Sequence, residues 1–308
     1  MLLCPVCSRP LREDEDRRGA SCAAGHHFDR AREGYLNLLR SSKAGDRTGD
    51  PKSQARSRRD FLDRGYYRPL RDALVDLVRA RVESAAAESA GTARPASSRP
   101  LTVLDICCGE GYYTSALGAI PGADVYGFDL SKEMVRLAAK RGGAAYFVAN
   151  MKAIPVADAS VDVATHLFAP FNEREFARVL RPGGTLFSVV PGARHLFGLK
   201  DVLYRTPYLN DEKLPEPSLP KSGVPVSGQS VSGKSGAGAE PGSATALRLV
   251  GTTKIAAQIT LATPADIDAV FQMTPYYYRT SESDRRKLDG VETLETPIEF
   301  VVGEYRRE

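Results

Sequence analysis

The chain contains 308 residues, of which 42% are hydrophobic and 26% are charged, a composition typical of soluble folded domains. Its apolar runs fall far short of the roughly 20 residues that a membrane helix needs, and residues 1–30 lack the basic-then-apolar order of a signal peptide, because Arg9, Arg12 and Glu13 come early. We therefore expect a cytoplasmic protein without a membrane partner, in a reducing compartment where clustered cysteines bind metal more often than they form disulfides.

Charge is concentrated near the beginning of the chain. Residues 1–71 hold 16 Lys and Arg residues and 10 Asp and Glu residues, a net charge of +6, whereas the whole chain carries +4. A basic segment on a near-neutral body is typical of proteins that bind a polyanion, although a solvated linker has the same composition.

The segment LCPVCSRPLREDEDRRGASCAAGHHFD, residues 3–29, contains three of the five cysteines and two of the four histidines. Cys4 and Cys7 form a C-x-x-C pair, and Cys22 and His26 follow after 14 residues as C-x-x-x-H. Two tight turns that each present two ligands suit a tetrahedral zinc ion in a closed structural site. Redox chemistry is less favoured because this C-x-x-C does not begin a helix after a strand. His27 is the alternative fourth ligand. The sequence therefore predicts one structural zinc ion.

The next part of the chain reads as a connector and a helix. Residues 41–59 lack apolar groups, which predicts a solvated connector. An amphipathic helix is predicted from Phe61 to Val78, and it leads into the low-complexity stretch 83–100. Residues 215–245 are rich in Pro, Gly and Ser, so we expect a flexible insertion there. These blocks predict three parts: a zinc-binding module (1–45), a linker and helix (46–99) and a larger domain (100–308).

From residue 101 onward, strand-like and helix-like segments alternate. Strands are predicted at 101–108, 123–130, 144–150, 160–170 and 184–192, with helices at 112–120, 131–142 and 172–180. Ser131 is the predicted N-cap of the second helix and Gly142 its C-terminal glycine. Residues 254–261, 265–273 and 296–305 are expected to add a strand, a helix and a final strand. This alternation predicts an α/β fold with a doubly wound parallel sheet and helices on both faces.

The segment VLDICCGEGYYT, residues 103–114, joins the first of these strands to the first helix. Ligands of open α/β sheets bind at the carboxyl ends of the strands. Gly109 and Gly111 would allow a sharp turn and close approach of a ligand, and Asp105 offers a carboxylate. The chain has no G-x-x-x-x-G-K-[ST] motif, which argues against a nucleoside triphosphate. Asp129 ends the next strand, where a carboxylate can accept both hydroxyls of a ribose.

A strand, D-x-x-x-G-x-G, a helix and a second strand ending in Asp resemble the class I S-adenosylmethionine-dependent methyltransferases, which have a Rossmann-like sheet. The resemblance implies that Asp105 lies near the amino-acid end of the cofactor, that the glycines flank its backbone and that Asp129 binds the ribose. Met151 matches the position that covers the adenine. The sequence departs from the family at Cys107, where glycine is usual. The position of Cys107 implies that it also contacts the cofactor.

The segments CPVC…CAAGHHFDRAREGYLNLL, RRDFLDRGYYRPLRDAL and LDICCGEGYYT resemble the RlmA/RrmA/TlrB family of bacterial 23S rRNA (guanine-N1)-methyltransferases over nearly the whole chain. This resemblance implies methylation of N1 of guanine 745 or 748 in a 23S rRNA hairpin that the zinc-ribbon-like module helps to recognise, and it leaves a homodimer open. The resemblance implies that the zinc ligands are Cys4, Cys7, Cys22 and His26. It also implies that four further residues contact the cofactor: Tyr67, Tyr113, Thr114 and His195.

The segment HLFAPF, residues 166–171, ends the fourth predicted strand, where relatives of the fold place a target-facing loop that contains proline. Phe168, Pro170 and Phe171 are candidates for contact with an extruded base, and a core position for both phenylalanines is an equal alternative. His166 is a candidate base or a structural histidine, with the structural role favoured. The sequence assigns no general base.

Arginines of the basic segment are candidates for phosphate contacts: Arg9, Arg12, Arg17, Arg18, Arg30, Arg32, Arg56, Arg58 and Arg59. Removing the charge of Arg56, Arg58 and Arg59 is expected to weaken RNA binding and to leave cofactor affinity intact.

Two other functions compete with RNA methylation. A small-molecule methyltransferase with an incidental zinc module would keep its activity after deletion of residues 1–45. A non-catalytic zinc protein would not bind S-adenosylmethionine.

Overall fold

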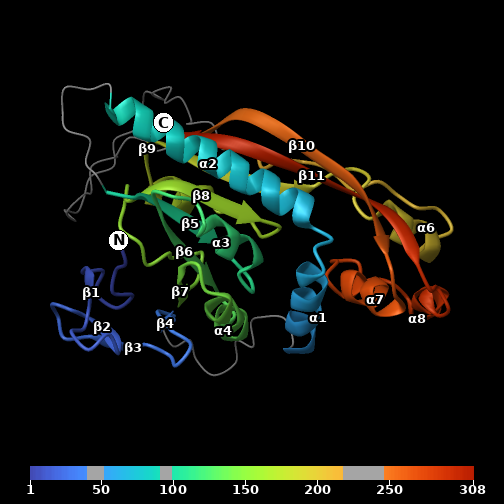
Figure 1. The fold of residues 1–308 in the computed structure, drawn as a ribbon, viewed down its shortest axis with the longest axis horizontal. Helices are drawn as coiled ribbons and strands as arrows, with labels where there is room; N and C mark the ends of the chain where they lie inside the picture. The colour runs from blue at the N-terminus through green and yellow to red at the C-terminus, as the bar shows by residue number, and fades with distance from the viewer. Residues whose placement is uncertain (40–51, 91–98, 218–245) are drawn as a thin grey trace, which may run out of the picture.

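The structure is a computed structural model that describes residues 1–39, 52–90, 99–217 and 246–308. The strands of its central sheet are β4 (Leu36–Asn37), β5 (Leu101–Ile106), β6 (Ala123–Asp129), β7 (Ala145–Val148), β8 (Val161–Leu167), β9 (Leu180–Pro191), β10 (Leu247–Leu261) and β11 (Leu294–Arg307). Their order in the sheet is β10-β11-β9-β8-β5-β6-β7-β4. Strands β4 to β9 pair in parallel, whereas β11 pairs antiparallel to both β9 and β10. Figure 1 shows the long β10–β11 pair at one edge of this sheet.

The helices are α1 (Lys52–Asp63), α2 (Arg68–Ala90), α3 (Tyr112–Leu117), α4 (Lys132–Arg141), α5 (Glu173–Val179), α6 (Phe197–Leu203), α7 (Pro264–Gln272) and α8 (Glu282–Arg285), followed by a 3-10 turn at Arg286–Leu288. Alternate side chains of β5 enter two separate apolar clusters. Val103 packs with residues of α2, α3 and α7, whereas Leu104 packs with residues of α5 on the opposite face. Helices therefore cover both faces, as predicted for a doubly wound sheet. None of the described helices is long and apolar enough to span a bilayer.

The N-terminal block forms a small antiparallel sheet of β1 (Leu11–Glu13), β2 (Gly19–Cys22) and β3 (His27–Asp29). It is joined to the central sheet at both of its ends. Leu2 bridges Val156, the Leu3 amide donates to Pro155 at 2.9 Å, and β4 pairs with β7. Ala20 also belongs to the apolar cluster that contains Leu104. This block therefore shares its core with the large sheet, which the sequence patterns did not predict.

Most predicted elements from residue 101 onward are confirmed, including the cap of α4, where the Ser131 hydroxyl accepts from the Met134 amide. The connector is a partial error. Residues 40–51 lie outside the described residues, but 52–59 are helical, because α1 has good helix formers and buries Ala55. The helix predicted from Phe61 to Val78 is two helices separated by a turn around Gly65. Residues 218–245 of the predicted insertion also lie outside the described residues.

Candidate zinc cluster and cofactor cleft

The four predicted zinc ligands come together at one end of the small sheet. Each pair lies on its own hydrogen-bonded turn. The Ser8 amide donates to the Cys4 carbonyl at 2.8 Å, and the Gly25 amide donates to the Cys22 carbonyl at 2.9 Å. The ligating atoms of Cys4, Cys7, Cys22 and His26 all lie within 4.8 Å of one another.

The distances between these atoms fit a tetrahedral zinc ion. The Cys7 and Cys22 sulfurs are 3.5 Å apart, and the His26 Nδ1 lies 3.4 Å from the Cys22 sulfur and 3.6 Å from the Cys4 sulfur. Ligand atoms at ordinary zinc distances are separated by about 3.5 to 3.8 Å. Burial disfavours the Cys22 thiolate, but backbone hydrogen bonds at Ala24 and His26 lower the pKa of this thiol to about 6. The cluster fits one structural zinc ion, with no ligand position left for a reaction.

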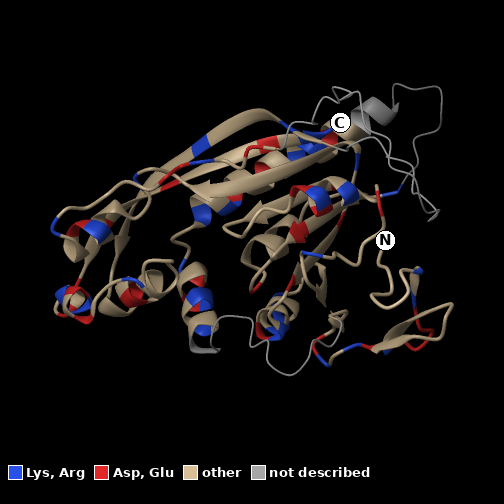
Figure 2. Ribbon diagram, turned by 180° about the vertical axis from the view of Figure 1, so that it is seen from behind, with Lys and Arg blue, Asp and Glu red and all other residues tan. Residues whose placement is uncertain are grey.

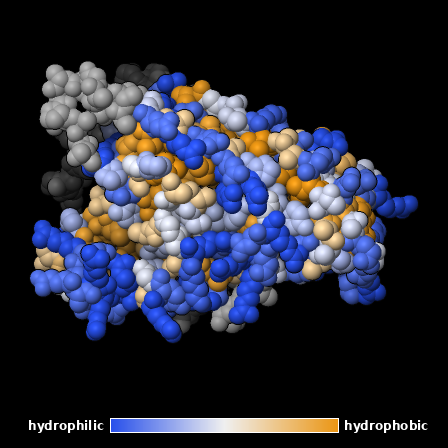
Figure 3. Space-filling model, viewed as in Figure 1, coloured by the Kyte–Doolittle hydropathy of each residue, from blue (hydrophilic) through white to orange (hydrophobic). Residues whose placement is uncertain are grey.

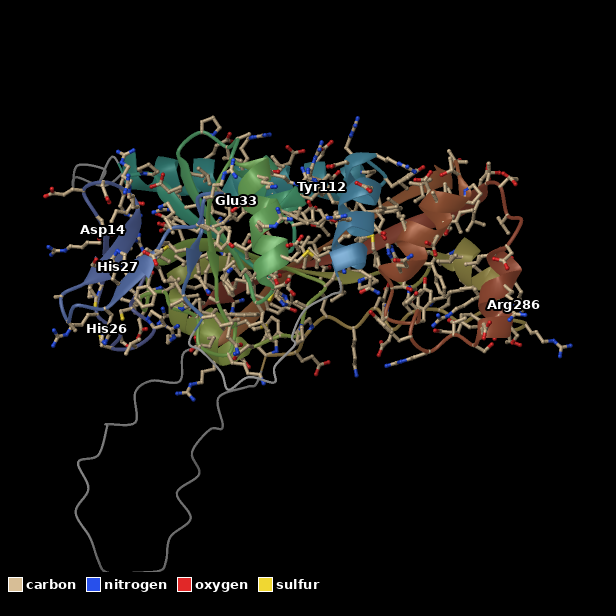
Figure 4. All side chains as sticks on the ribbon, turned by 90° about the horizontal axis from the view of Figure 1, so that it is seen from below. Asp14, His26, His27, Glu33, Tyr112 and Arg286 are labelled. Atoms are coloured by element: carbon tan, nitrogen blue, oxygen red, sulfur yellow. The ribbon has the colours of Figure 1, made fainter. Side chains whose placement is uncertain are left out.

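His27 does not belong to the cluster. Its Nε2 lies 2.8 Å from an oxygen of Asp14, and its side chain is half exposed. The Ser21 hydroxyl donates to the other Asp14 oxygen at 2.7 Å, and the hydrogen bonds of Ser21 and His27 lower the pKa of Asp14. Figure 4 shows His27 beside Asp14, with His26 at a separate position. This placement supports the choice of His26 over His27.

A cleft of about 260 Å³ opens at the carboxyl ends of β5, β6 and β8. Five of the predicted cofactor residues line it: Asp105, Cys107, Gly109, Tyr113 and Asp129. They come from two neighbouring strands, the loop between β5 and α3, and the first turn of α3, so the sheet and its first crossover bring them together.

Asp105 is the buried acid of the cleft. It is 1% exposed, and its two oxygens accept hydrogen bonds from the hydroxyls of Thr114 (2.5 Å) and Thr165 (2.7 Å). Burial raises the pKa of Asp105 to about 6, the two hydrogen bonds oppose this rise, and the Asp129 charge adds to it. Thr114, a predicted cofactor residue, is thus placed behind Asp105.

Asp129 holds the two loops of the cleft together. One carboxylate oxygen accepts from the Gly109 amide at 3.1 Å and the other from the Ser131 amide at 2.8 Å. The Ser131 hydroxyl caps α4. Because both bonds come from backbone amides, they orient the carboxylate and leave lone pairs available for ribose hydroxyls.

The two glycines of the motif differ in purpose. A Cβ at Gly109 would meet nothing within 4 Å, so a ligand can approach this backbone closely. A Cβ at Gly111 would lie 2.8 Å from the Ala138 Cβ in α4. The structure thus gives Gly111 a packing role, because the absence of a side chain lets α3 and α4 lie close together, and its role in ligand approach stays a prediction.

Two residues of the cleft, Tyr112 and Tyr113, have buried hydroxyls without a hydrogen-bond partner among the described residues, and of the two Tyr113 is the predicted cofactor residue. An unpartnered buried polar group is unfavourable unless a ligand pairs with it. Two carboxylates, an open glycine backbone and the Tyr113 hydroxyl are groups that fit the amino-acid and ribose parts of S-adenosylmethionine.

The cleft continues into a larger groove of about 950 Å³, and Cys107 lines both. Met151 and Leu130 line this groove beside Cys4 and Leu38 of the N-terminal block. The Cys107 sulfur lies 3.7 Å from the Met151 sulfur. Met151 is therefore placed beyond Asp129, where an adenine would extend from a ribose held by that residue.

Tyr67 and His195 do not line the cleft. The Tyr67 hydroxyl lies 3.1 Å from the His195 Nε2, and the Glu299 amide donates to the His195 Nδ1 at 3.3 Å. Burial, aided by the nearby Lys200 charge, lowers the pKa of His195 to about 3. This neutral pair packs against Phe300 beside the cleft, so the structure places it as support for the site.

The three candidates for base contact lie in different surroundings. Phe168 lines the cleft, is 43% exposed and has φ of 55°, in a region that is unusual for a bulky side chain. Phe171 packs against Phe176 and Tyr305. Pro170 lines the larger groove. Only Phe168 presents an exposed aromatic ring to the cleft.

His166 is a satisfied structural histidine. It is 2% exposed, its Nδ1 lies 3.2 Å from the Ser188 hydroxyl, and its Nε2 lies 3.1 Å from the Pro170 carbonyl. Burial lowers the pKa of His166 to about 4. The carbonyl requires a proton on Nε2, and the hydroxyl can donate to Nδ1, so neither nitrogen remains to accept a proton from a substrate.

Helix α1 contributes residues to the cleft that the sequence analysis did not foresee. Arg58 and Leu62, one turn apart, both line it, and their i,i+4 spacing is the signal that could have revealed a shared face. Arg59 instead lies 3.5 Å from Asp63, and Arg56 is exposed. The three arginines therefore do not share one surface, and the expectation that loss of the Arg58 charge leaves cofactor affinity intact is revised, because Arg58 lines the cleft.

The arginines of the N-terminal block fall into two groups, those that lie beside a carboxylate and those that form no ion pair within the described residues. Arg30 pairs with Glu13, and Arg18 lies 3.7 Å from Asp16. Exposed arginines that form no ion pair within the described residues are Arg9, Arg12, Arg17 and Arg32. Both signs of charge are interspersed on this block in Figure 2, and hydrophilic side chains dominate its surface in Figure 3.

Comparisons with known proteins identify both parts. Residues 103–184 match a methyltransferase-domain family model, and residues 2–43 match the model of the RlmA N-terminal zinc ribbon. The chain is 39% identical to a Micromonospora griseorubida protein assigned as a 23S rRNA (guanine-N1)-methyltransferase, over 66% of this chain and 69% of that protein. It is 37% identical to the 23S rRNA (guanine(748)-N1)-methyltransferase of Streptomyces fradiae, over 66% of this chain and 67% of that enzyme.

Proposed function

This chain belongs to the family of 23S rRNA (guanine-N1)-methyltransferases, and we propose that it transfers a methyl group from S-adenosylmethionine to N1 of a guanine in a 23S rRNA hairpin loop. The observation that carries this proposal is the presence, in one chain, of a zinc ribbon and a cleft with carboxylates at two adjacent strand ends. The same proposal assigns residues 1–45 to RNA recognition, 100–308 to catalysis, and the protein to the cytoplasm.

The residues of the cleft suit the separate parts of the cofactor. The Asp105 carboxylate attracts the amino group, and the Asp129 carboxylate accepts the ribose hydroxyls. Arg58, which lines the same cleft from α1, supplies a positive charge for the cofactor carboxylate. When bound, S-adenosylmethionine supplies an electrophilic methyl group on a sulfonium ion. Transfer then requires alignment of N1 with that methyl group, so the positioning of both molecules contributes much of the rate.

Phe168 is the residue that we assign to the target base. It follows β8 at the edge of the cleft, and its exposed ring contacts Phe300 at a centroid distance of 5.8 Å. Stacking on this ring would hold an extruded guanine at the cleft. Pro170 and Phe171 shape the loop that carries Phe168.

The proton on guanine N1 does not leave to a histidine of this chain. His26 belongs to the zinc cluster, His27 pairs with Asp14, and both nitrogens of His166 and of His195 have partners. We therefore expect transfer without an imidazole base.

The direct test is methylation of a synthetic hairpin carrying the 23S rRNA sequence around guanine 748. N1 methylation blocks the Watson–Crick edge, so primer extension should stop at one guanine, and mass spectrometry of the nucleosides should identify 1-methylguanosine. An Asp129→Ala variant with zinc retained serves as the inactive control. Methylation at another atom, or none with folded protein and cofactor bound, would refute the proposal.

A further inference from the structure

Residues 204–212, here called the tyrosine loop, expose large apolar side chains near the far end of the sheet. Tyr208 is 51% exposed and Leu209 is 55% exposed. Most side chains of this size in the described chain are buried, so an ordered loop that keeps two of them in solvent suggests a contact surface. Apolar and hydrophilic side chains also mix at this end of the molecule (Figure 3).

A buried lysine holds the tyrosine loop in place. Lys200 is 1% exposed, and its ammonium donates to the Tyr208 carbonyl at 3.1 Å and to the Asn210 Oδ1 at 2.5 Å. The same ammonium lies 4.1 Å from the centre of the Tyr208 ring. Burying an ammonium group is unfavourable unless it is well hydrogen-bonded. Lys200 makes no ion pair among the described residues, so its role there is to order this loop.

The tyrosine loop is also attached to the segment that supports the cleft. The Asn210 side-chain amide donates to the carbonyls of Gly192 and His195, both at 3.0 Å. The His195 ring contacts Phe300 at 4.7 Å, and Phe300 contacts Phe168 at 5.8 Å. A continuous series of contacts therefore joins the loop to the aromatic residue at the edge of the cleft.

We propose that the tyrosine loop is a stacking platform for unpaired nucleotides of the RNA hairpin on the side of the cleft away from the zinc ribbon. This inference rests on the proposed function. Sequence-tolerant binding of single-stranded RNA uses exposed aromatic rings beside basic groups. Here the ammonium of Lys200 occupies one side of the Tyr208 ring, and about half of that side chain remains open to solvent.

Exposed charges of both signs surround the tyrosine loop: Asp211 within it is acidic, whereas Arg205 and Arg279 are candidates for contact with RNA phosphates. Arg205 and Arg279 are exposed, and neither forms an ion pair within the described residues. The Arg279 charge is close enough to oppose the rise that burial causes in the pKa of Tyr208. The zinc ribbon and α6 lie at opposite ends of the long axis, with β5 and α3 between them (Figure 1). Figure 4 likewise shows His26 of the ribbon and Arg286, which follows α8, at opposite ends. Contacts at both ends would hold the RNA across the cleft.

The test measures binding of a fluorescein-labelled 23S rRNA hairpin by fluorescence anisotropy. Tyr208→Ala should raise its Kd about 5- to 100-fold, the range expected for loss of one stacked base. Tyr208→Phe should bind as the wild type does, whereas Tyr208→Leu should behave like the alanine variant. Tyr278→Ala is the matched control, because Tyr278 is 65% exposed but bonds to Gln54 of α1 through its hydroxyl; its Kd should stay within about twofold.

A second set of measurements separates platform formation from general stability. Lys200→Met should weaken RNA binding, but it should add nothing when Tyr208 is already alanine, because Lys200 acts through the loop. Tyr208→Ala should raise KM for the hairpin while kcat and cofactor affinity are retained. Equal RNA affinity of Tyr208→Ala and wild type would overturn the inference, as would wild-type affinity in Tyr208→Leu or a change in oligomeric state alone. If the wild type itself does not methylate the hairpin, the proposed function fails instead.

Discussion

The zinc cluster and the cofactor cleft are assembled in opposite ways. The cluster draws four ligands from residues 4–26, on two turns that are each closed by their own backbone hydrogen bonds. The cleft draws its lining from α1, from the loops after β5 and β6 with the starts of α3 and α4, and from the end of β8. A local site therefore depends on its metal for stability, whereas a site gathered from distant segments depends on the core of the sheet.

The two regions nevertheless meet at one loop. Residues 149–154 line the larger groove, and the two attachments of the N-terminal block flank them. Leu38 bonds to Val148 on one side, and Leu3 bonds to Pro155 on the other. Substitutions that disrupt one region, with measurement of ligand binding in the other, show how far the two regions depend on each other.

The largest effect is expected from His26→Ala, which should reduce bound zinc from one ion per chain to less than about half at equal free zinc, because one of four ligands is lost. Inductively coupled plasma mass spectrometry measures the content. His27→Ala is the matched control and should retain zinc. Cofactor affinity should fall only a few-fold in the His26 variant, through the loop at 149–154. Loss of zinc in the His27 variant alone would contradict the assigned ligand set.

The next effect is the pH dependence of cofactor binding. Because the pKa of Asp105 is about 6, its carboxylate is ionised at pH 7.5 and largely protonated at pH 5, so the Kd for S-adenosylmethionine should rise about tenfold over that interval. Isothermal titration calorimetry measures it, and Asp105→Asn should bind weakly without this pH dependence.

The same shift has a consequence for stability. A carboxyl group whose pKa is raised on folding contributes stability at low pH that is lost as the pH rises through about 6. The unliganded Asp105→Asn variant should therefore melt no lower than the wild type at pH 7.5. A much lower melting temperature would show that the hydrogen bonds to Thr114 and Thr165 outweigh the burial of charge.

Substitution of two arginines of α1 is expected to change cofactor affinity by a similar or smaller factor. Arg58→Met should weaken cofactor binding about tenfold, because a charge in the cleft is lost, while Arg56→Met, at an exposed position of the same helix, should leave it unchanged. Calorimetry with each purified variant distinguishes them. If Arg58→Met bound the cofactor as tightly as Arg56→Met does, the cofactor role of Arg58 would be contradicted. Both residues would then remain candidates for phosphate contacts only.

The smallest effect is expected from Cys107→Gly. Cys107 has φ of 59°, and its thiol has a pKa that burial, with the charges of Asp129 and Asp105, raises to about 12. Glycine would relieve the backbone strain and add chain entropy to the unfolded state, effects of about 1 kcal/mol that largely cancel. Cofactor affinity should change less than about threefold. A larger loss would mean that the sulfur contact with Met151 helps to shape the adenine end.

Short-range patterns in the sequence were sufficient for the zinc ligands, the alternation of strands and helices, the cap of α4 and the acidic residues Asp105 and Asp129. Each of these depends on residues a few positions apart, or on the rule that parallel strands end at one edge of a sheet. Only the tertiary structure decided that residues 52–59 form a helix, that Arg58 lines the cleft, that Gly111 serves helix packing and that Tyr67 and His195 lie behind the site. It alone also joined the zinc ribbon to the sheet and ordered the tyrosine loop around Lys200. These outcomes depend on contacts between segments far apart in the chain. Local periodicity shows which side chains are buried, but it does not determine which distant side chain packs against them.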